Sequence, residues 1–518
     1  MVCAFIPVKC SRSLIENSCT DADTLGKHLT SVFVRPQDAA NRNFGRPPDL
    51  DPMPTIQLFE DGHCNPLHPF HLIDGVAGIR FGALTQQERW DLLLPFLSAN
   101  ASDTAALHVN ARWVPSRSSV SLLSALKPGE KLVQGTDVLA AFDIQTLGEL
   151  HSVSASSPQM MLRSANDLFG LLGDQIALDV QILKDVWSLQ PFSPPSHTIV
   201  FGPLDAFLVH PTANIKAATV DLESGPVIVG PGAAIEAGAH LKGPLVICEG
   251  ATVRMAGRIS GPTTIGPHCK VGGEVSNVNF QGWANKAHDG FLGNSVIGRW
   301  CNLGAGTESS NLKNTYGEVR QWDAQNQSMK GTGLQFCGLL MGDHSKCGIG
   351  TTFNTGTVVD PASAIFDAGF PPKHLPPFSW YNARTATMEV QDLERMLDAV
   401  HGFHRFLGSK LKTVTGEPEA IDEVIARVTD MARAARSVAA LQSGHQLNVL
   451  LARVGDRVDL EVRVAVGPRD RARGRARPRT PARPSNRSST QQVLTLVSFM
   501  VQSPTRRFTT SSKRFSVT

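Results

Sequence analysis

The sequence predicts an α/β domain followed by a parallel β-helix of hexapeptide repeats and then by C-terminal helices. Short apolar runs alternate with helical patterns before residue 200, and aliphatic residues then recur at every sixth position. Past residue 380 the apolar spacing turns helical. Glycine (45) and proline (33) are plentiful and aromatic residues make up only 6%, which suits turn-rich β structure better than a helical bundle.

Composition argues against several classes of function. A formal net charge of +3 over 518 residues gives no reason to expect a nucleic-acid partner. The apolar runs fall short of the roughly 18 residues that a membrane span needs, so no membrane association is expected. The nine cysteines are scattered without a CxxC pair, which indicates reduced thiols in a cytoplasmic protein.

The predicted α/β domain spans residues 53–200 and follows a leader, residues 1–52, that we expect to be disordered. The strand-like runs TIQLF and ALHVNARWV alternate with the helical runs LTQQERWDLLLPFL and DVQILKDVWSLQ. In the first helical run Thr85 stands three residues before Glu88, an arrangement typical of a helix start.

A six-residue period defines the β-helix, which we place at residues 201–380. Eight aliphatic residues follow one another at intervals of six: Val229, Ile235, Leu241, Ile247, Val253, Ile259, Ile265 and Val271. The same register returns in two later series: Ile297 and Leu303, then Met341, Cys347, Phe353, Val359 and Ile365. Six is the period of a parallel β-helix with three short strands per coil, so these side chains are expected to stack inside the coils.

Three segments depart from the repeat. Residues 307–335 form an irregular excursion, and a loop of that length inside a regular solenoid is usually functional. Residues 381–445 show helical spacing and are expected to pack at the end of the solenoid. Residues 446–518 form a basic, Arg-, Pro- and Ser-rich tail that we expect to be disordered, because it lacks the apolar content of a core.

Ionisable residues interrupt the repeat in the stretch NKAHDGFLGNSVIGRWCNLGAGTESSN, residues 285–311. His288 beside a cleft between subunits is suited to accept a proton, Lys286 to hold an anionic group, and Asp289 to orient the imidazole. The small residues Gly304 and Ala305 would let a bulky cofactor approach backbone N–H groups. Taken alone, a single histidine is more often structural, and a run of small residues also fits a β-helix corner.

The same stretch carries a longer pattern, H-x-x-[FY]-L-G-x-x-x-I-G-x-x-x-N-x-G-A-G-T, from His288 to Thr307. In this pattern the chain resembles the acetyltransferase half of the bifunctional N-acetylglucosamine-1-phosphate uridylyltransferase/glucosamine-1-phosphate acetyltransferases. The wider block, with GGEVSN, SNLKNTYGEV and GFPPKHLPPFSW, is more similar to the short bacterial variant of that family, the sugar nucleotidyltransferases. The resemblance implies a left-handed β-helix, a homotrimer, and acetyl-CoA and a sugar phosphate as substrates.

The resemblance also implies roles for single residues. His288 matches the catalytic base that deprotonates the sugar amine for attack on acetyl-CoA. Asn302 and Asn311 match positions that contact the substrate or orient the base. Ala305 matches a backbone contact to the acyl-CoA.

The chain departs from the family in both halves. Two tyrosines of the family pattern are Phe291 and Leu312 here, which leaves the acyl-transfer chemistry intact but changes the contacts to the sugar. The N-terminal domain lacks the phosphate-binding loop GxGTRMxSxxPK, and residues 74–75 read Asp-Gly where the short variant has Arg-Pro. We therefore expect a degenerate nucleotidyltransferase-like domain, with Arg80 and Arg112 as the nucleotide-binding candidates and Mg²⁺ needed only if the domain is active.

The lead hypothesis is an acetyl-CoA-dependent N-acetyltransferase that acts on an amino sugar or its phosphate in nucleotide-sugar biosynthesis. The alternative is a sugar-1-phosphate nucleotidyltransferase, a UDP- or dTDP-sugar pyrophosphorylase, whose β-helix serves trimerisation. A non-enzymatic scaffold and a metal hydratase of the carbonic-anhydrase type are further alternatives. The hydratase needs three converging histidines, whereas His268, His288 and His344 are far apart in the sequence, so no metal site is predicted.

Overall fold

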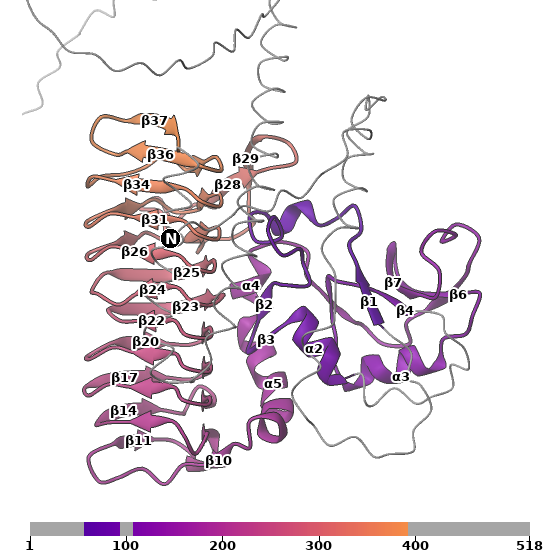
Figure 1. Ribbon diagram of the computed structural model, residues 1–518, viewed down its shortest axis with the longest axis horizontal. Helices are drawn as coiled ribbons and strands as arrows, with labels where there is room; N and C mark the ends of the chain where they lie inside the picture. Colours follow the sequence, from indigo (N-terminus) through magenta and orange to yellow (C-terminus); the bar gives the residue numbers. More distant parts are fainter. Residues whose placement is uncertain (1–55, 94–106, 392–518) are drawn as a thin grey trace, which may run out of the picture. The chain divides into compact units, whose positions relative to one another are not determined.

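Residues 56–93 and 107–391 are described by the computed structural model, and they form an α/β domain and a β-solenoid (Figure 1). The predicted leader, the basic tail and nearly all of the predicted C-terminal helical segment lie outside the described residues. Within the described ranges no helix is both long enough and apolar enough to span a membrane. The six cysteines in this part of the chain are free thiols, as the sequence predicts.

The α/β domain is built on a mixed sheet with the strand order β1-β4-β7-β6-β8. These strands are β1 (Ile56–Phe59), β4 (Leu107–Asn110), β6 (Glu130–Gln134), β7 (Asp137–Ala141) and β8 (His151–Ser154). Two short ribbons join β2 (Arg80–Phe81) to β3 (Leu84–Thr85), and β5 (Trp113–Val114) to β9 (Met160–Met161). The helices are α2 (Gln86–Leu93), α3 (Arg117–Ala125), α4 (Asp167–Gly170) and α5 (Leu172–Val186), with the 3₁₀ turns η3 (Asn65–Leu67) and η5 (Leu204–Ala206).

The start of α2 shows why this segment is helical. The main-chain N–H of Glu88 donates to Thr85 Oγ1 (3.1 Å), and the N–H of Thr85 donates to Glu88 Oε2 (2.8 Å). This reciprocal capping satisfies two donors that a helix start leaves without partners. One turn later Trp90 is buried and packs edge to face on Trp113, with 5.2 Å between ring centroids. The predicted helix start is therefore confirmed, and its first turns lie in the core of the domain.

The strands of the solenoid stack from coil to coil (Figure 1). Their parallel pairing defines three faces. The first face contains β13 (Asn214–Ile215), β16 (Ala234–Ile235), β19 (Thr252–Val253), β22 (Lys270–Val271), β24 (Asn285–Lys286), β26 (Asn302–Leu303), β31 (Lys346–Cys347), β34 (Ala364–Phe366) and β36 (Ser379–Asn382). The second face contains β11 (Ile199–Phe201), β14 (Ala218–Asp221), β17 (Ala239–Lys242), β20 (Arg258–Ser260) and the first halves of β23 (Glu274–Phe280) and β25 (Phe291–Ile297). The third face contains β12 (Phe207–Val209), β15 (Val227–Val229), β18 (Leu245–Ile247), β21 (Thr263–Ile265), the second halves of β23 and β25, β30 (Leu339–Met341), β33 (Thr357–Val359) and β35 (His374–Leu375).

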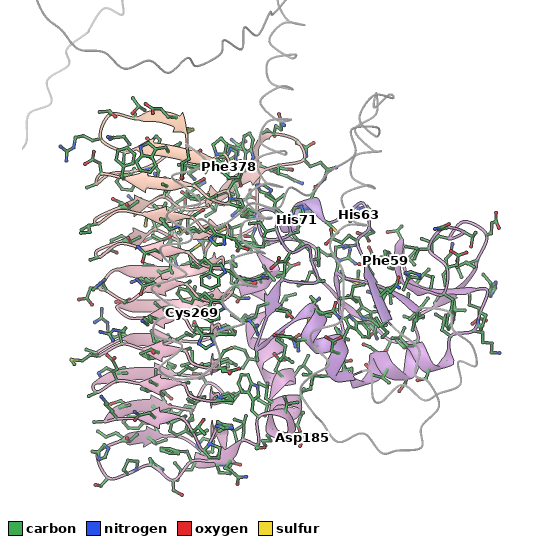
Figure 2. All side chains as sticks on the ribbon, viewed as in Figure 1. Phe59, His63, His71, Asp185, Cys269 and Phe378 are labelled. Carbon is green, nitrogen blue, oxygen red and sulfur yellow. The ribbon has the colours of Figure 1, made fainter. Side chains whose placement is uncertain are left out.

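The aliphatic residues at intervals of six form the core of the solenoid. All eight of the first series and all of the two later series are buried in a single cluster, which confirms the predicted register. Cys269, labelled in Figure 2, belongs to the same cluster inside the coils. Each fully buried aliphatic side chain contributes about 1.5–3 kcal/mol relative to exposure, so the stack is the main source of stability in this half of the chain.

Shorter strands mark the excursion and the two ends of the solenoid. The excursion contains β27 (Glu308–Ser309), which pairs with β32 (Thr352–Phe353), and the hairpin of β28 (Arg320–Asp323) and β29 (Ser328–Gly331). The first coil already includes β10 (Gln190–Pro191), which is antiparallel to β12, so the solenoid begins before the predicted residue 201.

The helix predicted from residue 381 onwards is wrong for the residues that the structure describes. Residues 387–390 form β37 (Thr387–Val390), which pairs antiparallel with β36 and places Met388 opposite Tyr381. Asn382 Oδ1 accepts hydrogen bonds from the N–H groups of Arg384 and Thr385, which closes the turn between the two strands. The edge of the last coil therefore takes up these residues as a strand despite their helical spacing. Residues 392–445 lie outside the described part.

The third face packs against the α/β domain. Outward residues of the face share one buried core with residues of the domain: Leu208, Ile228, Val246, Val296, Leu340 and Val358 with Leu67, Phe81, Leu168, Leu172 and Ile176. In the same contact the N–H of Arg80 donates to Gln281 Oε1 (2.6 Å), and Gln281 Nε2 donates back to Arg80 O (2.8 Å). One shared apolar core and a polar pair thus join the domain to the solenoid.

We predict that Ile265→Ala lowers the free energy of unfolding by about 2–5 kcal/mol, because it leaves a cavity in the aliphatic stack. Ile199→Ala is the matched control, because the Ile199 side chain is 56% exposed, and it should cost less than about 1 kcal/mol. Urea unfolding followed by circular dichroism measures both. Equal losses for the two variants would contradict the role given to the stack.

Candidate active site

The stretch that breaks the repeat forms turns at one corner of the solenoid, between the first and second faces. The N–H of Gly306 donates to Asp289 O (3.0 Å), and the N–H of Gly350 donates to Ala305 O (2.9 Å). Gly290 has φ +128°, and a Cβ there would lie 2.1 Å from Thr307 O, so only glycine lets the two turns approach this closely. The turn after His288 therefore stacks directly on the turn of the small residues 304–307, as the hypothesis of a shared site requires.

Lys286 lies inside the solenoid rather than at the surface. It occupies the inward position of β24, opposite Val271, and its side chain is buried. Its ammonium donates to Gly272 O (3.2 Å) and to His288 O (2.9 Å). Burial lowers the pKa of Lys286 to about 8, while the charges of Asp289 and Glu308 act in the opposite direction. In the structure this lysine anchors the turn that carries His288, and its ammonium is engaged by backbone oxygens inside the coils rather than open to an anionic group.

His288 itself is exposed on this turn. Among the residues that the structure describes, none forms a hydrogen bond with its imidazole. Asp289 is exposed beside it and does not bond the ring, so the predicted orienting contact is not formed. An imidazole held only by its backbone is available to accept a proton from a bound molecule.

A second group of site residues lies on the second face, one strand after His288. The N–H of Phe291 donates to Glu308 Oε2 (3.0 Å). A Cβ at Gly293 would lie 2.6 Å from Phe291 Cζ and 2.8 Å from Asn311 Nδ2, so the ring and the amide border the same spot. Asn311 Nδ2 in turn donates to Asn294 Oδ1 (2.7 Å). The structure thus brings Phe291 and Asn311 together.

Glu308 is the residue that the sequence analysis missed. It is exposed on β27, next to the turn of residues 304–307, and its carboxylate bonds the backbone at Phe291. The sequence does show an acidic residue directly after the run Gly-Ala-Gly-Thr, and this position could have marked Glu308 as a site residue. Its contact with Phe291, however, depends on the stacking of two coils that are 17 residues apart in the chain.

Asn302 lies on a different face from Asn311. It belongs to β26 on the first face, where its Oδ1 accepts a hydrogen bond from Asn285 Nδ2 (2.7 Å). The two asparagines predicted to contact the substrate therefore do not meet within one chain, and only Asn311 lies with Phe291 and Glu308 on the second face.

The two arginines predicted to bind nucleotide are buried and engaged by protein groups. Arg80 donates to Ala83 O and Gln281 O and pairs with Glu88. Arg112 pairs with Asp61 (2.5 Å) and Asp137 (2.9 Å), and it also donates to Leu162 O. Both guanidinium groups thus hold the α/β domain together in this structure.

The acids on Arg112 show how strongly that arginine is held. Burial acts against the ionisation of Asp61 and Asp137, but hydrogen bonds from Arg112 keep the pKa of both carboxyl groups below its usual value. A triphosphate would have to displace these carboxylates before it reached the guanidinium group.

The histidines of the hydratase hypothesis do not converge. His268, Trp283, Trp300 and His344 form one stack of rings along a corner, with 4.0, 4.7 and 6.1 Å between successive centroids. Two tryptophans thus separate His268 from His344, and His288 stands on another corner. The structure brings no three of these histidines together.

Comparisons with known proteins agree with the division into two parts. Residues 56–186 match a family model described as sugar nucleotidyl transferase, which confirms the prediction of a nucleotidyltransferase-like α/β domain. The chain has no significant match among curated proteins.

Among solved structures, the chain is similar to AntD, an N-acyltransferase from Bacillus cereus solved with dTDP-4-amino-4,6-dideoxyglucose and coenzyme A (11% identity, 44% of this chain, 96% of that chain, TM-score 0.18). It is also similar to the UDP-N-acetylglucosamine acyltransferase from Campylobacter jejuni (16% identity, 44% and 94% of the two chains, TM-score 0.19). A third is the acetyltransferase domain of PglB from Neisseria gonorrhoeae with acetyl coenzyme A (14% identity, 44% and 85%, TM-score 0.12). The solenoid fold itself is established by the strand pairing of this chain.

We predict that the free energy of unfolding of the wild type rises with pH relative to that of the variant Lys286→Met. Because the pKa of Lys286 falls from 10.5 to about 8 on folding, unfolding takes up a proton between these two pH values. The difference in free energy of unfolding between wild type and variant should therefore shift in favour of the wild type by roughly 1–3 kcal/mol from pH 8 to pH 10.5.

Urea unfolding at a series of pH values measures this difference. Lys242→Met is the control, because the Lys242 side chain is 50% exposed, and its difference from wild type should not change with pH in the same way. Parallel pH profiles for wild type and Lys286→Met would show that the ammonium is not buried.

Proposed function

We propose that this protein is an acetyl-CoA-dependent N-acetyltransferase of an amino sugar or its phosphate, with His288 as the general base. One observation carries the proposal: the exposed, unbonded imidazole of His288 stands on a turn hydrogen-bonded to the small-residue turn 304–307. The resemblance of the pattern from His288 to Thr307 to a sugar acetyltransferase supports the same assignment. The match of the α/β domain to a sugar nucleotidyl transferase model supports a role for the protein in sugar chemistry.

In this proposal His288 removes a proton as the amine of the sugar attacks the thioester carbonyl. The new C–N bond forms, the C–S bond breaks, and the coenzyme A thiolate leaves and takes up a proton. No described group accepts a hydrogen bond from the N–H of Ala305, whereas the N–H groups of Gly304, Gly306 and Thr307 are all engaged. This N–H is therefore the donor that we assign to the thioester oxygen, with Gly304 leaving room for the acyl-CoA.

The charges around His288 favour an acceptor with a positive group. Asp289 and Glu308 are exposed near the imidazole, while the ammonium of Lys286 is turned into the coils. Opposite charges raise the local concentration of a ligand, so an amino sugar in its ammonium form is attracted to this corner. Asn311 and Phe291 border the place that we assign to the sugar ring.

The proposal includes a homotrimer. Asn302 matches a substrate-contacting position but lies on the first face, away from Asn311. A neighbouring copy that presents its first face to this corner would bring its own Asn302 to the site. The closed symmetry of such an assembly is common among homo-oligomers.

A second candidate function is a sugar-1-phosphate nucleotidyltransferase, which the family match over residues 56–186 favours. It would require Mg²⁺ and phosphate-binding groups in the α/β domain. Arg80 and Arg112, which we proposed for this role, would first have to leave their present partners. The acyl-transfer proposal requires no such rearrangement.

We predict that His288→Gln lowers kcat for acetyl transfer to glucosamine 1-phosphate and related amino sugars by about 10²–10⁴-fold, because the general base is lost. The KM for acetyl-CoA should change little, because the variant leaves the 304–307 turn intact. Release of the coenzyme A thiol measures the rate.

His240→Gln is the matched control, because His240 is exposed on β17 of the same solenoid and lies outside the site. It should retain full activity. Acetyl transfer that is unaffected by His288→Gln would overturn the assigned base. Pyrophosphate release from UTP or dTTP with a sugar 1-phosphate, in the absence of any acetyl transfer, would establish the second candidate instead.

A further inference from the structure

A cluster of metal-ligating side chains lies where the α/β domain meets the last coils of the solenoid. Its members are His68, Asp360 and His374, and one ligand atom from each lies within 4.8 Å of the others. His68 follows the 3₁₀ turn η3, Asp360 follows β33, and His374 begins β35. His68 and Asp360 are 292 residues apart in the chain, so only the folded structure brings them together.

One carboxylate holds both imidazoles. Asp360 Oδ1 lies 2.5 Å from Nε2 of His68, and Oδ2 lies 3.0 Å from Nε2 of His374. The exposed fractions of the side chains are 11% for His68, 18% for His374 and 4% for Asp360. The carboxylate is thus buried, while the two histidine side chains are each partly exposed.

Each oxygen of the buried Asp360 carboxylate contacts one imidazole. Within the described part of the chain its ion-pair partners are these two imidazoles alone, with no lysine or arginine among them. An ionised carboxylate at this place is a buried negative charge. Burying such a charge is costly unless a cation accompanies it, and a divalent ion would meet this need.

The three side chains are held in place by their surroundings. The ring of Trp322, from the excursion hairpin, stacks on the ring of His374 at 4.2 Å between centroids and 8° between planes. The N–H of Asp360 donates to Leu375 O (2.9 Å), and its carbonyl accepts from Ser345 Oγ (2.9 Å). A third imidazole lies next to the cluster: His71, labelled in Figure 2, stands 6.2 Å from His68 between ring centroids, and its buried Nδ1 has no partner among the described residues.

We propose that His68, Asp360 and His374 form a binding site for a divalent transition-metal ion, with Zn²⁺ as the preferred ion. Two imidazole nitrogens and one carboxylate oxygen are ligands that suit Zn²⁺, whereas Mg²⁺ and Ca²⁺ prefer oxygen ligands alone. Three protein ligands leave the fourth position of a tetrahedral ion to water or to an anion.

Binding requires only a small change of side-chain positions. Ligand atoms about 2.0–2.2 Å from a tetrahedral ion are separated from one another by roughly 3.3 Å. His68 Nε2 and Asp360 Oδ1, now 2.5 Å apart, would separate by less than about 1 Å. Rotation of either imidazole about its side-chain bonds supplies that movement without a change in the backbone.

The metal site is distinct from the proposed acetyltransferase site. His374 stands on the third face, in register with Val358, whereas His288 stands on the corner between the first and second faces. A failure of one proposal therefore does not affect the other.

The test uses full-length protein stripped of metal with a chelator, then titrated with Zn²⁺ and, for spectroscopy, with Co²⁺. The wild type should bind one more equivalent of Zn²⁺ than His374→Phe, which keeps a ring against Trp322 but removes the nitrogen. Removal of this ligand should weaken binding at the site by more than about 100-fold, beyond the 10–100-fold effect of outer-shell changes. Co²⁺ at the site should give visible absorption without a thiolate charge-transfer band.

Two further variants keep the test decisive. Asp360→Asn should lose the same equivalent of metal, and His240→Phe, an exposed histidine elsewhere on the solenoid, should retain it. Zn²⁺ should raise the Tm of wild type and His240→Phe but not of His374→Phe. A cooperative melting transition of His374→Phe in the same measurement shows that this variant is folded. The proposal is overturned if wild type, Asp360→Asn and His374→Phe bind the same number of ions with the same spectrum, or if the wild type binds none.

Discussion

The inward stacking of aliphatic side chains is the constraint on which the rest of the structure depends. Each coil contributes inward side chains from its faces to one buried cluster. The stacking of these side chains holds neighbouring coils in register. Because the register is fixed by hydrophobic packing, turns that belong to different coils lie on top of one another at the corners. The placement of His288 over the 304–307 turn follows from this register, as does the exposure of one flat face to the α/β domain.

The candidate site lies where the inward residues of the first face change in residue type and in their spacing along the chain. On the first face successive inward residues are 18 apart from Val253 to Val271, then 15 apart to Lys286 and 17 apart to Leu303. The short coils remove a corner, so β23 and β25 each run without interruption from the second face to the third. A buried lysine takes one of these inward positions and ties the backbone of the following turn. The chain thus gives up part of its hydrophobic packing where it presents an exposed imidazole, as is common at functional sites.

Much of the solenoid was predictable because its signal is local and repeats. Every residue of the six-residue series points inward, and the capped start of α2 at Thr85 also follows from neighbouring residues. Long-range contacts were not predictable from such patterns. The inward turn of Lys286, the bond between Glu308 and Phe291 and the cluster around Asp360 depend on which coils stack and on how the α/β domain docks. The helical spacing after residue 380 was misleading because β36 offers an open strand edge to pair with.

We propose that one corner of the solenoid binds acetyl-CoA beside His288. Amide hydrogen exchange of the full-length protein with and without acetyl-CoA tests it most directly. On binding, exchange should slow in residues 304–307 and 288–291 and stay unchanged in the turn at residues 231–233 of an earlier coil. Unchanged exchange at residues 288–307, or protection confined to the α/β domain, would contradict it.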